Sequence, residues 1–95
     1  MNLKQRTDGA METREGIKDE LIQIASAILG VEADEITENS YFRSDLGADS
    51  LDEVEMLIEM EKSFGVQVED GVIEWYDPKT VGEAVDMFHE ILSKQ

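Results

Sequence analysis

The sequence predicts an all-α fold: a small antiparallel bundle of three main helices plus one short helix, with a long loop between the first two helices. Three segments of the 95-residue chain carry apolar residues at helical spacing. A glycine follows each of the first two segments, and a capping-box pattern precedes the third. A chain of this length forms one small domain, with a modest core and no deep active-site cavity.

The first helix is expected to begin between Thr13 and Glu15 and to end at Leu29. Its apolar stripe consists of Ile17, Leu21, Ile24, Ala25, Ile28 and Leu29. Gly30 follows as a natural residue for the helix C-terminus. Residues 1–12 are polar and show no period, so we expect a disordered tail there and a helical domain over residues 13–95.

Residues 31–46 mix acidic and apolar residues at no clean period, which predicts a long loop. We expect four apolar residues to hold this loop against the core: Ile36, Tyr41, Phe42 and Leu46. A loop of this length in a small domain is usually functional or unusual.

The second helix is expected from about Ser50 to Phe64, with Asp49 as the better N-cap residue and Gly65 at its end. An advance of about 100° per residue gives this helix two apolar faces. One face can pack on the other helices and consists of Met56, Leu57, Met60 and Phe64. The other face consists of Leu51, Val54 and Ile58, flanked by Glu55 and Glu59.

The second apolar face has two interpretations. A central helix of a small bundle can be buried on a wide arc. A docking surface is the interpretation we favour, because apolar anchors inside an acidic rim are typical of transient interfaces and would attract a basic partner.

The rest of the chain predicts two further helices. Residues 66–76 are short and mixed, with at most a turn or two of helix before Pro78. The last helix should start at Thr80, with Glu83 completing a capping box. Its buried stripe consists of Val81, Ala84, Val85, Phe88, Ile91 and Leu92.

The net charge of −15 comes from 23 acidic and 8 basic residues. This balance excludes nucleic acid as a main partner, because phosphate-backbone binders need clusters of Lys and Arg. Between Arg43 and Lys62 there is no basic residue, while seven acids surround Ser50. There is no cysteine and no apolar stretch long enough to span a membrane, so we expect a cytoplasmic protein. The high net charge favours a monomer.

Ser50 stands where the loop turns into the second helix. Backbone N–H groups at a helix start are free to bind an anion, and the helix dipole favours negative charge there. A phosphate ester on Ser50 would therefore sit favourably. The segment is typical of an attachment site and not of a catalytic centre.

The run from Asp45 to Leu51, Asp-Leu-Gly-Ala-Asp-Ser-Leu, closely resembles the attachment motif of acyl carrier proteins, particularly those that serve fatty-acid and related synthases. The likeness covers about residues 14–93. It implies that Ser50 carries 4′-phosphopantetheine through a phosphodiester, and that a holo-acyl-carrier-protein synthase, a phosphopantetheinyl transferase, installs this arm from coenzyme A. The thiol of the arm would hold acyl groups as thioesters.

The resemblance also implies roles for the neighbours of Ser50. Asp49 matches the position that helps the transferase to hold Mg²⁺. Partner enzymes with basic docking patches would grip the second helix at Leu51, Asp52, Val54, Glu55, Ile58 and Glu59. Met56, Leu57 and Met60 are candidates to line a space for the acyl chain, although ordinary core is the alternative for each. Trp75 and Tyr76 depart from the family pattern and indicate a different pocket or partner surface.

Other functions fit less well. A serine hydrolase would need a histidine beside Ser50, and the one histidine, His89, lies in the last helix. The nucleophile-elbow pattern is absent, and a calcium loop begun at Asp45 would place Ser50 where glycine is needed. Two alternatives stay open: a carrier-like adaptor subunit without a covalent arm, and an aminoacyl or peptidyl carrier.

Overall fold

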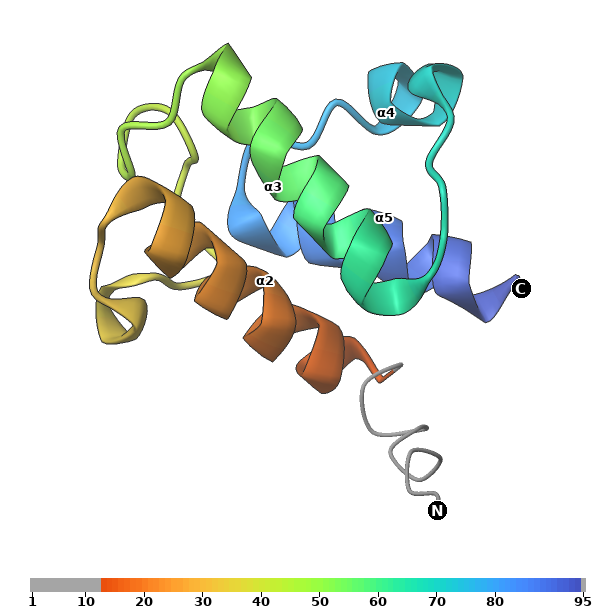
Figure 1. The fold of residues 1–95 in the computed structure, drawn as a ribbon, viewed down its shortest axis with the longest axis horizontal. Coiled ribbons are helices and arrows are strands. Elements are labelled where there is room, and N and C mark those ends of the chain that lie inside the picture. The colour runs from red at the N-terminus through yellow and green to blue at the C-terminus, as the bar shows by residue number, and fades with distance from the viewer. Residues whose placement is uncertain (1–12, 95) are drawn as a thin grey trace.

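The computed structural model describes residues 13–94 and confirms the predicted all-α bundle (Figure 1). The elements in chain order are α2 (Arg14–Leu29), the short 3-10 turn η1 (Ala33–Glu35), α3 (Ser50–Phe64), α4 (Asp70–Tyr76) and α5 (Val81–Ser93). α2 runs opposite to α3 and α5, and packs against both (Figure 1). The disordered tail predicted for residues 1–12 lies outside the described residues. No helix of the described part of the chain is long and apolar enough to cross a membrane.

The helix ends follow the capping chemistry that the sequence predicted. Gly30 and Gly65 end α2 and α3 in the left-handed conformation, with φ of 71° and 67°. Glycine adopts this conformation without steric cost. At the start of α5, Thr80 accepts a hydrogen bond from the backbone N–H of Glu83, and the Glu83 carboxylate accepts one from the backbone N–H of Thr80. This confirms the predicted capping box.

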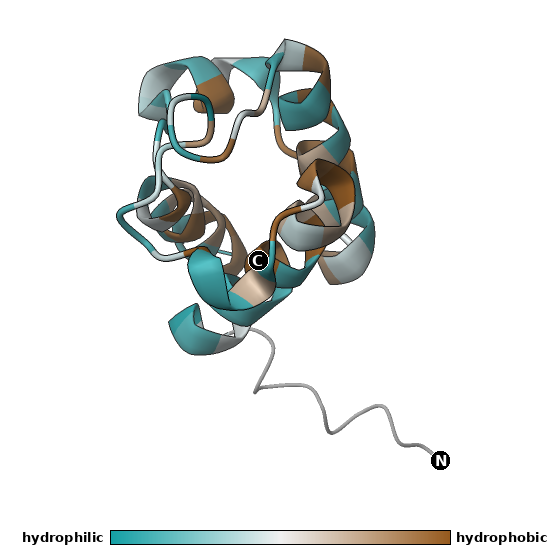
Figure 2. Cartoon of the chain, turned by 90° about the vertical axis from the view of Figure 1, so that its left-hand side faces the viewer, coloured by the Kyte–Doolittle hydropathy of each residue, from teal (hydrophilic) through white to brown (hydrophobic). Residues whose placement is uncertain are grey.

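The core lies between α2, α3 and α5. Its largest fully buried side chains are Ile17, Met60, Val81 and Val85. Figure 2 shows hydrophobic segments of the helices turned toward the middle of the bundle and hydrophilic segments outside. The amphipathic pattern of the sequence therefore places α3 with one face on the core.

The long loop is held by the segment that leads into α5. Phe42 donates a backbone hydrogen bond to Lys79, and Val81 donates one to Ser40, each at 3.0 Å between N and O. Tyr41 and Thr80 form an isolated antiparallel bridge between these hydrogen bonds. Ile36, Phe42 and Leu46 are buried, as predicted. The loop is therefore fixed at its middle, well before it reaches Ser50.

The prediction that Tyr41 also holds the loop to the core is wrong. Its side chain is 50% exposed. The bridge with Thr80 makes the backbone extended at this point, and side chains of an extended segment alternate between its two sides. Because Phe42 points into the core, Tyr41 points to solvent.

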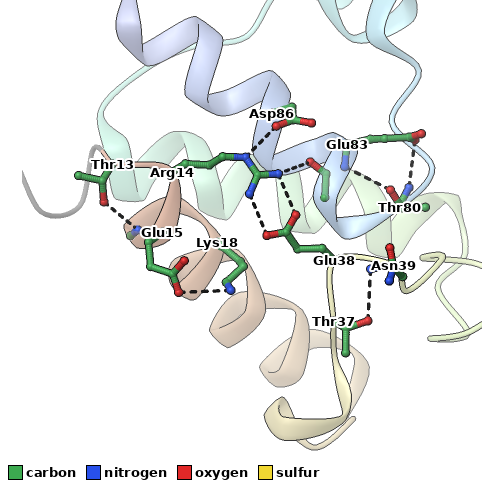
Figure 3. A network of polar contacts seen from close by, with 12 residues as sticks. Thr13, Arg14, Glu15, Lys18, Thr37, Glu38, Asn39, Thr80, Glu83 and Asp86 are labelled. Carbon is green, nitrogen blue, oxygen red and sulfur yellow. Dashed lines mark hydrogen bonds and ion pairs between the residues drawn. The ribbon is translucent and has the colours of Figure 1, made fainter.

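A polar clamp ties the loop to both α2 and α5 (Figure 3). The Arg14 guanidinium donates two hydrogen bonds of 2.8 Å to the Glu38 carboxylate and one of 2.8 Å to Asp86. The hydrogen bond from Arg14 is the main cause that lowers the pKa of Glu38 below its ordinary value. Gly82 lies close by, and a Cβ there would come within 3.1 Å of the Glu38 backbone oxygen. A glycine inside α5 thus allows the loop to approach the helix.

Candidate functional site

Ser50 is the first residue of α3 and is exposed. A capping box sets this helix start: Asp49 Oδ1 accepts a hydrogen bond from the Asp52 N–H at 2.9 Å, and Asp52 Oδ2 accepts one from the Asp49 N–H at 3.1 Å. The sequence predicted Asp49 as the cap and missed the reciprocal bond from Asp52. The sequence does contain an acid, Asp52, three residues after the cap, which is the capping-box spacing. Glu or Gln is the usual residue at that position.

The backbone around Ser50 leaves donors for an anion. In the first turn of α3, the N–H groups of Asp52 and Glu53 bond to Asp49. Those of Ser50 and Leu51 have no partner among the described residues, because the residues four positions back lie outside the helix and do not present their carbonyls to it. Two free N–H groups and the positive end of the helix dipole suit a phosphodiester on the Ser50 hydroxyl.

The acids nearest this helix start are already engaged. The Arg43 guanidinium donates to both oxygens of Glu53, each at 3.0 Å between N and O. This contact raises the pKa of Arg43. Since the carboxylates of Asp49 and Asp52 also accept hydrogen bonds, a phosphate at Ser50 would meet less repulsion than the acidic sequence suggests. The pair between Arg43 and Glu53 escaped sequence reasoning because a turn, not helical spacing, brings the residues together.

The second apolar face of α3 is exposed. Leu51 is 65% exposed, Val54 51% and Ile58 43%. Glu55 and Glu59 beside them are exposed, and Asp52 is half-buried. Met56 and Met60 on the opposite face are buried. The interpretation of α3 as a helix buried on a wide arc is therefore wrong.

A shallow groove continues this face onto α2. Ile24, Ala27 and Ile28 of α2 line the groove together with Glu55, Ile58 and Glu59 of α3. The sequence places Ile24 and Ile28 in the apolar stripe of α2, and the structure shows both half-buried. The exposed apolar surface is thus wider than α3 alone.

A cavity of about 510 Å³ begins at Ser50 and passes between α3, α4 and α5. Met56, Leu57 and Met60 line it from α3, with Ile73 of α4 and Met87 and Phe88 of α5. Its volume lies in the range of small-molecule pockets. This space is open to solvent on one side, so it agrees with the expectation that a chain of this size has no deep enclosed cavity. Methionine is flexible and fills irregular gaps, so this lining suits contents of changing shape.

The arrangement does not provide hydrolytic chemistry. His89 is exposed on α5 and does not line the cavity that begins at Ser50. Within residues 13–94, no three acidic or histidine side chains are grouped to hold a metal ion. Among the described residues, Ser50 thus has no histidine beside it of the kind that a serine hydrolase requires.

Two comparisons with known proteins bear on this site. The family profile of the phosphopantetheine attachment site matches residues 19–88. A solved acyl carrier protein from Enterococcus faecalis, described for its high thermal stability, is 35% identical. The alignment covers 82% of this chain and 96% of that one, with a TM-score of 0.65. With most of the chain matched in both sequence and fold, the protein belongs to the acyl carrier proteins, which bear phosphopantetheine and act as carriers and not as enzymes.

Proposed function

We propose that Ser50 is the residue that bears 4′-phosphopantetheine, and that residues 13–95 form the carrier domain. The observation that carries this proposal is the exposed hydroxyl at the start of α3, beside two free backbone N–H groups. In the transfer, Ser50 Oγ forms the new bond to phosphorus, adenosine 3′,5′-bisphosphate leaves coenzyme A, and the hydroxyl proton passes to the transferase. The arm supplies the thiol that this cysteine-free chain lacks.

The cavity that begins at Ser50 supports a role for Met56, Leu57 and Met60 in sheltering an acyl chain. Burial of apolar chain in such a space is favourable by about 0.8 kcal/mol per methylene. We place the carrier in fatty-acid synthesis or in a related lipid or polyketide pathway, as a cytoplasmic monomer. The apolar lining favours acyl cargo over aminoacyl cargo.

The arm is tested by intact-mass measurement after incubation with coenzyme A, Mg²⁺ and a phosphopantetheinyl transferase. Wild type and Ser44→Ala should gain one phosphopantetheine, since Ser44 is an exposed serine of the neighbouring loop. Ser50→Ala should gain none. A wild-type chain that stays unmodified with several transferases would favour the adaptor without an arm. Mass analysis of thioesters on protein purified from its host then separates acyl cargo from aminoacyl cargo.

The exposed face of α3 is proposed as the docking surface for the transferase and for synthase enzymes with basic patches. Leu51, Val54 and Ile58 would be the anchors, and Asp52, Glu55 and Glu59 the acidic rim. Glu55→Lys should slow association with such an enzyme at low salt, and the defect should shrink as salt rises. Glu32→Lys is the matched control, because it makes the same charge change at an exposed acid before η1. Equal rates for the two variants would contradict this surface.

Ile58→Asp tests the apolar anchors. Ile58 is 43% exposed, so the substitution should leave the melting temperature nearly unchanged and weaken the complex. A large loss of stability without a specific loss of binding would assign Ile58 to the core.

A further inference from the structure

The aromatic pair on α4 is unused by the carrier function described above. Trp75 is 79% exposed, and it is the one tryptophan of the chain. Its ring meets the Tyr76 ring edge to face, with centroids 5.0 Å apart and planes at 83°. Tryptophan is enriched where proteins contact other proteins, and burying it on binding removes a large apolar area from water.

The two rings border a groove of about 590 Å³ between α4 and the C-terminal part of α5. Val72 and Ile91 give this groove an apolar floor, and Glu69 and Glu90 bring carboxylates from the two helices. None of these residues belongs to the exposed face of α3 or to the cavity that begins at Ser50. The groove is thus a separate surface.

The groove is preorganised. The Tyr76 hydroxyl donates a hydrogen bond to Glu90, and Lys94 Nζ lies 3.1 Å from the other oxygen of that carboxylate. These contacts fix Tyr76, and the edge-to-face contact then fixes Trp75 against it. A surface whose rings are already placed loses little conformational entropy when it binds.

The charge around the groove selects a cation. Of the four acids in residues 69–78, Glu69 lines this groove, whereas Asp70, Glu74 and Asp77 line the cavity that begins at Ser50. Lys94 also lines the groove, and its ammonium is paired with Glu90, while Lys79 is paired with Asp77. The carboxylate of Glu69 has no partner among the described residues, so the groove keeps one unpaired acid. An anionic lipid or a nucleic acid would be repelled here, whereas a basic group would find both unpaired acid and an exposed aromatic ring.

We propose that this Trp75 groove binds an arginine side chain presented by a partner protein. The guanidinium stacks on the Trp75 ring and approaches Glu69, and the methylene stem lies on Val72 and Ile91. Arginine suits the site better than lysine, because its planar, weakly hydrated head stacks on aromatic faces. The groove provides a second contact, on α4 and α5, for a protein that also engages α3.

The test uses the full chain and a capped pentapeptide with a central arginine flanked by leucines. Binding is followed by amide chemical shifts and by the fluorescence of Trp75. We expect shifts centred on Val72, Trp75 and Ile91, and affinity about two- to fivefold above that of the same peptide with citrulline, the neutral isostere of arginine. Equal affinity for the citrulline peptide, or shifts confined to α3, would overturn the proposal.

Two variants locate the interaction. Trp75→Leu keeps an apolar side chain and should weaken the arginine peptide about two- to fivefold, with no effect on the citrulline peptide. Glu69→Gln should weaken it in a salt-dependent way, while the control Glu32→Gln, with the same change of charge, should not. The arginine site would be refuted if both test variants bound the arginine peptide as wild type does. It would also be refuted if self-association of the chain alone explained the fluorescence change of Trp75. Loading of Ser50 is measured separately by mass, so the outcome does not depend on the carrier proposal.

Discussion

Two substitutions separate the capping role of Asp49 from the role proposed for it in phosphopantetheine transfer. Its carboxylate accepts a hydrogen bond from the Asp52 N–H at 2.9 Å, which caps α3. By resemblance to carrier proteins, we propose that the same carboxylate helps a transferase to hold Mg²⁺. Asp49→Ala removes both functions, whereas Asp49→Asn keeps a side-chain oxygen that can cap and removes the charge.

The structure sets the expected magnitudes. Asp49 is exposed, so water can satisfy the Asp52 N–H after Asp49→Ala, and the loss is that of an N-cap alone, about 1 kcal/mol. For a domain of this size this lowers the melting temperature by about 4–8 °C. Asp49→Asn loses a favourable charge at the helix start and relieves repulsion among the neighbouring acids, so stability should change by less than about 0.5 kcal/mol.

The assay pairs thermal unfolding, followed by far-UV circular dichroism, with the rate at which a transferase adds phosphopantetheine, followed by intact mass. Asp49→Ala should be less stable and load slowly, and Asp49→Asn should be stable and load as slowly as the alanine variant. Wild-type loading of Asp49→Asn would refute the Mg²⁺ role. A loss of stability in Asp49→Asn equal to that in Asp49→Ala would refute the reasoning about the cap.

Three further outcomes are expected. Met60 is fully buried and lines the cavity, so Met60→Ala should lower the free energy of unfolding by about 2–5 kcal/mol in urea titrations. A loss below about 1 kcal/mol would show that the surrounding side chains collapse into the space left by Met60. Arg14→Gln should cost at most about 1 kcal/mol at neutral pH, because the clamp is about one-third exposed. The pKa of Glu38 is lower in the folded state than its ordinary value of 4.5, so its pairing with Arg14 stabilises the fold above that pH. The stability difference between wild type and Arg14→Gln should therefore shrink as pH falls below 4.5. A difference undiminished at about pH 3 would contradict the pairing. Mg²⁺ should raise the melting temperature modestly at low salt by screening the net charge of −15. Screening is the expected cause because no three acids of the described part are grouped to chelate the ion. No shift would show that repulsion among the acids costs little stability.

Local rules were sufficient to predict the helices. Gly30 and Gly65 mark helix ends, and Asp49 and Thr80 mark helix starts, because each acts within one turn of its own backbone. The two faces of α3 also follow from periodicity alone, since the angle between Met60 and Ile58 is fixed by the helix. These features needed no knowledge of the rest of the fold.

The contacts that place Ser50 could not be predicted in this way. Arg14 meets Glu38 and Asp86 across 24 and 72 residues of sequence, and nothing local indicates those partners. Tyr41 was assigned to the core on its composition, while its orientation depends on a bridge to Thr80. The cavity depends on the spacing of α3, α4 and α5, which the pattern of one helix does not determine.

The hydrogen bonds that join residues 38–42 to residues 79–82 have a consequence for protein synthesis. The loop before Ser50 lacks these three hydrogen bonds until the chain has been made as far as the first turn of α5, although Glu38 can already meet Arg14 of α2. A nascent chain stopped before that point carries the whole attachment motif without the contacts that hold it in place. If Ser50 bears the arm as proposed, we therefore expect a transferase to modify the chain more slowly before residues 79–82 have been made than after.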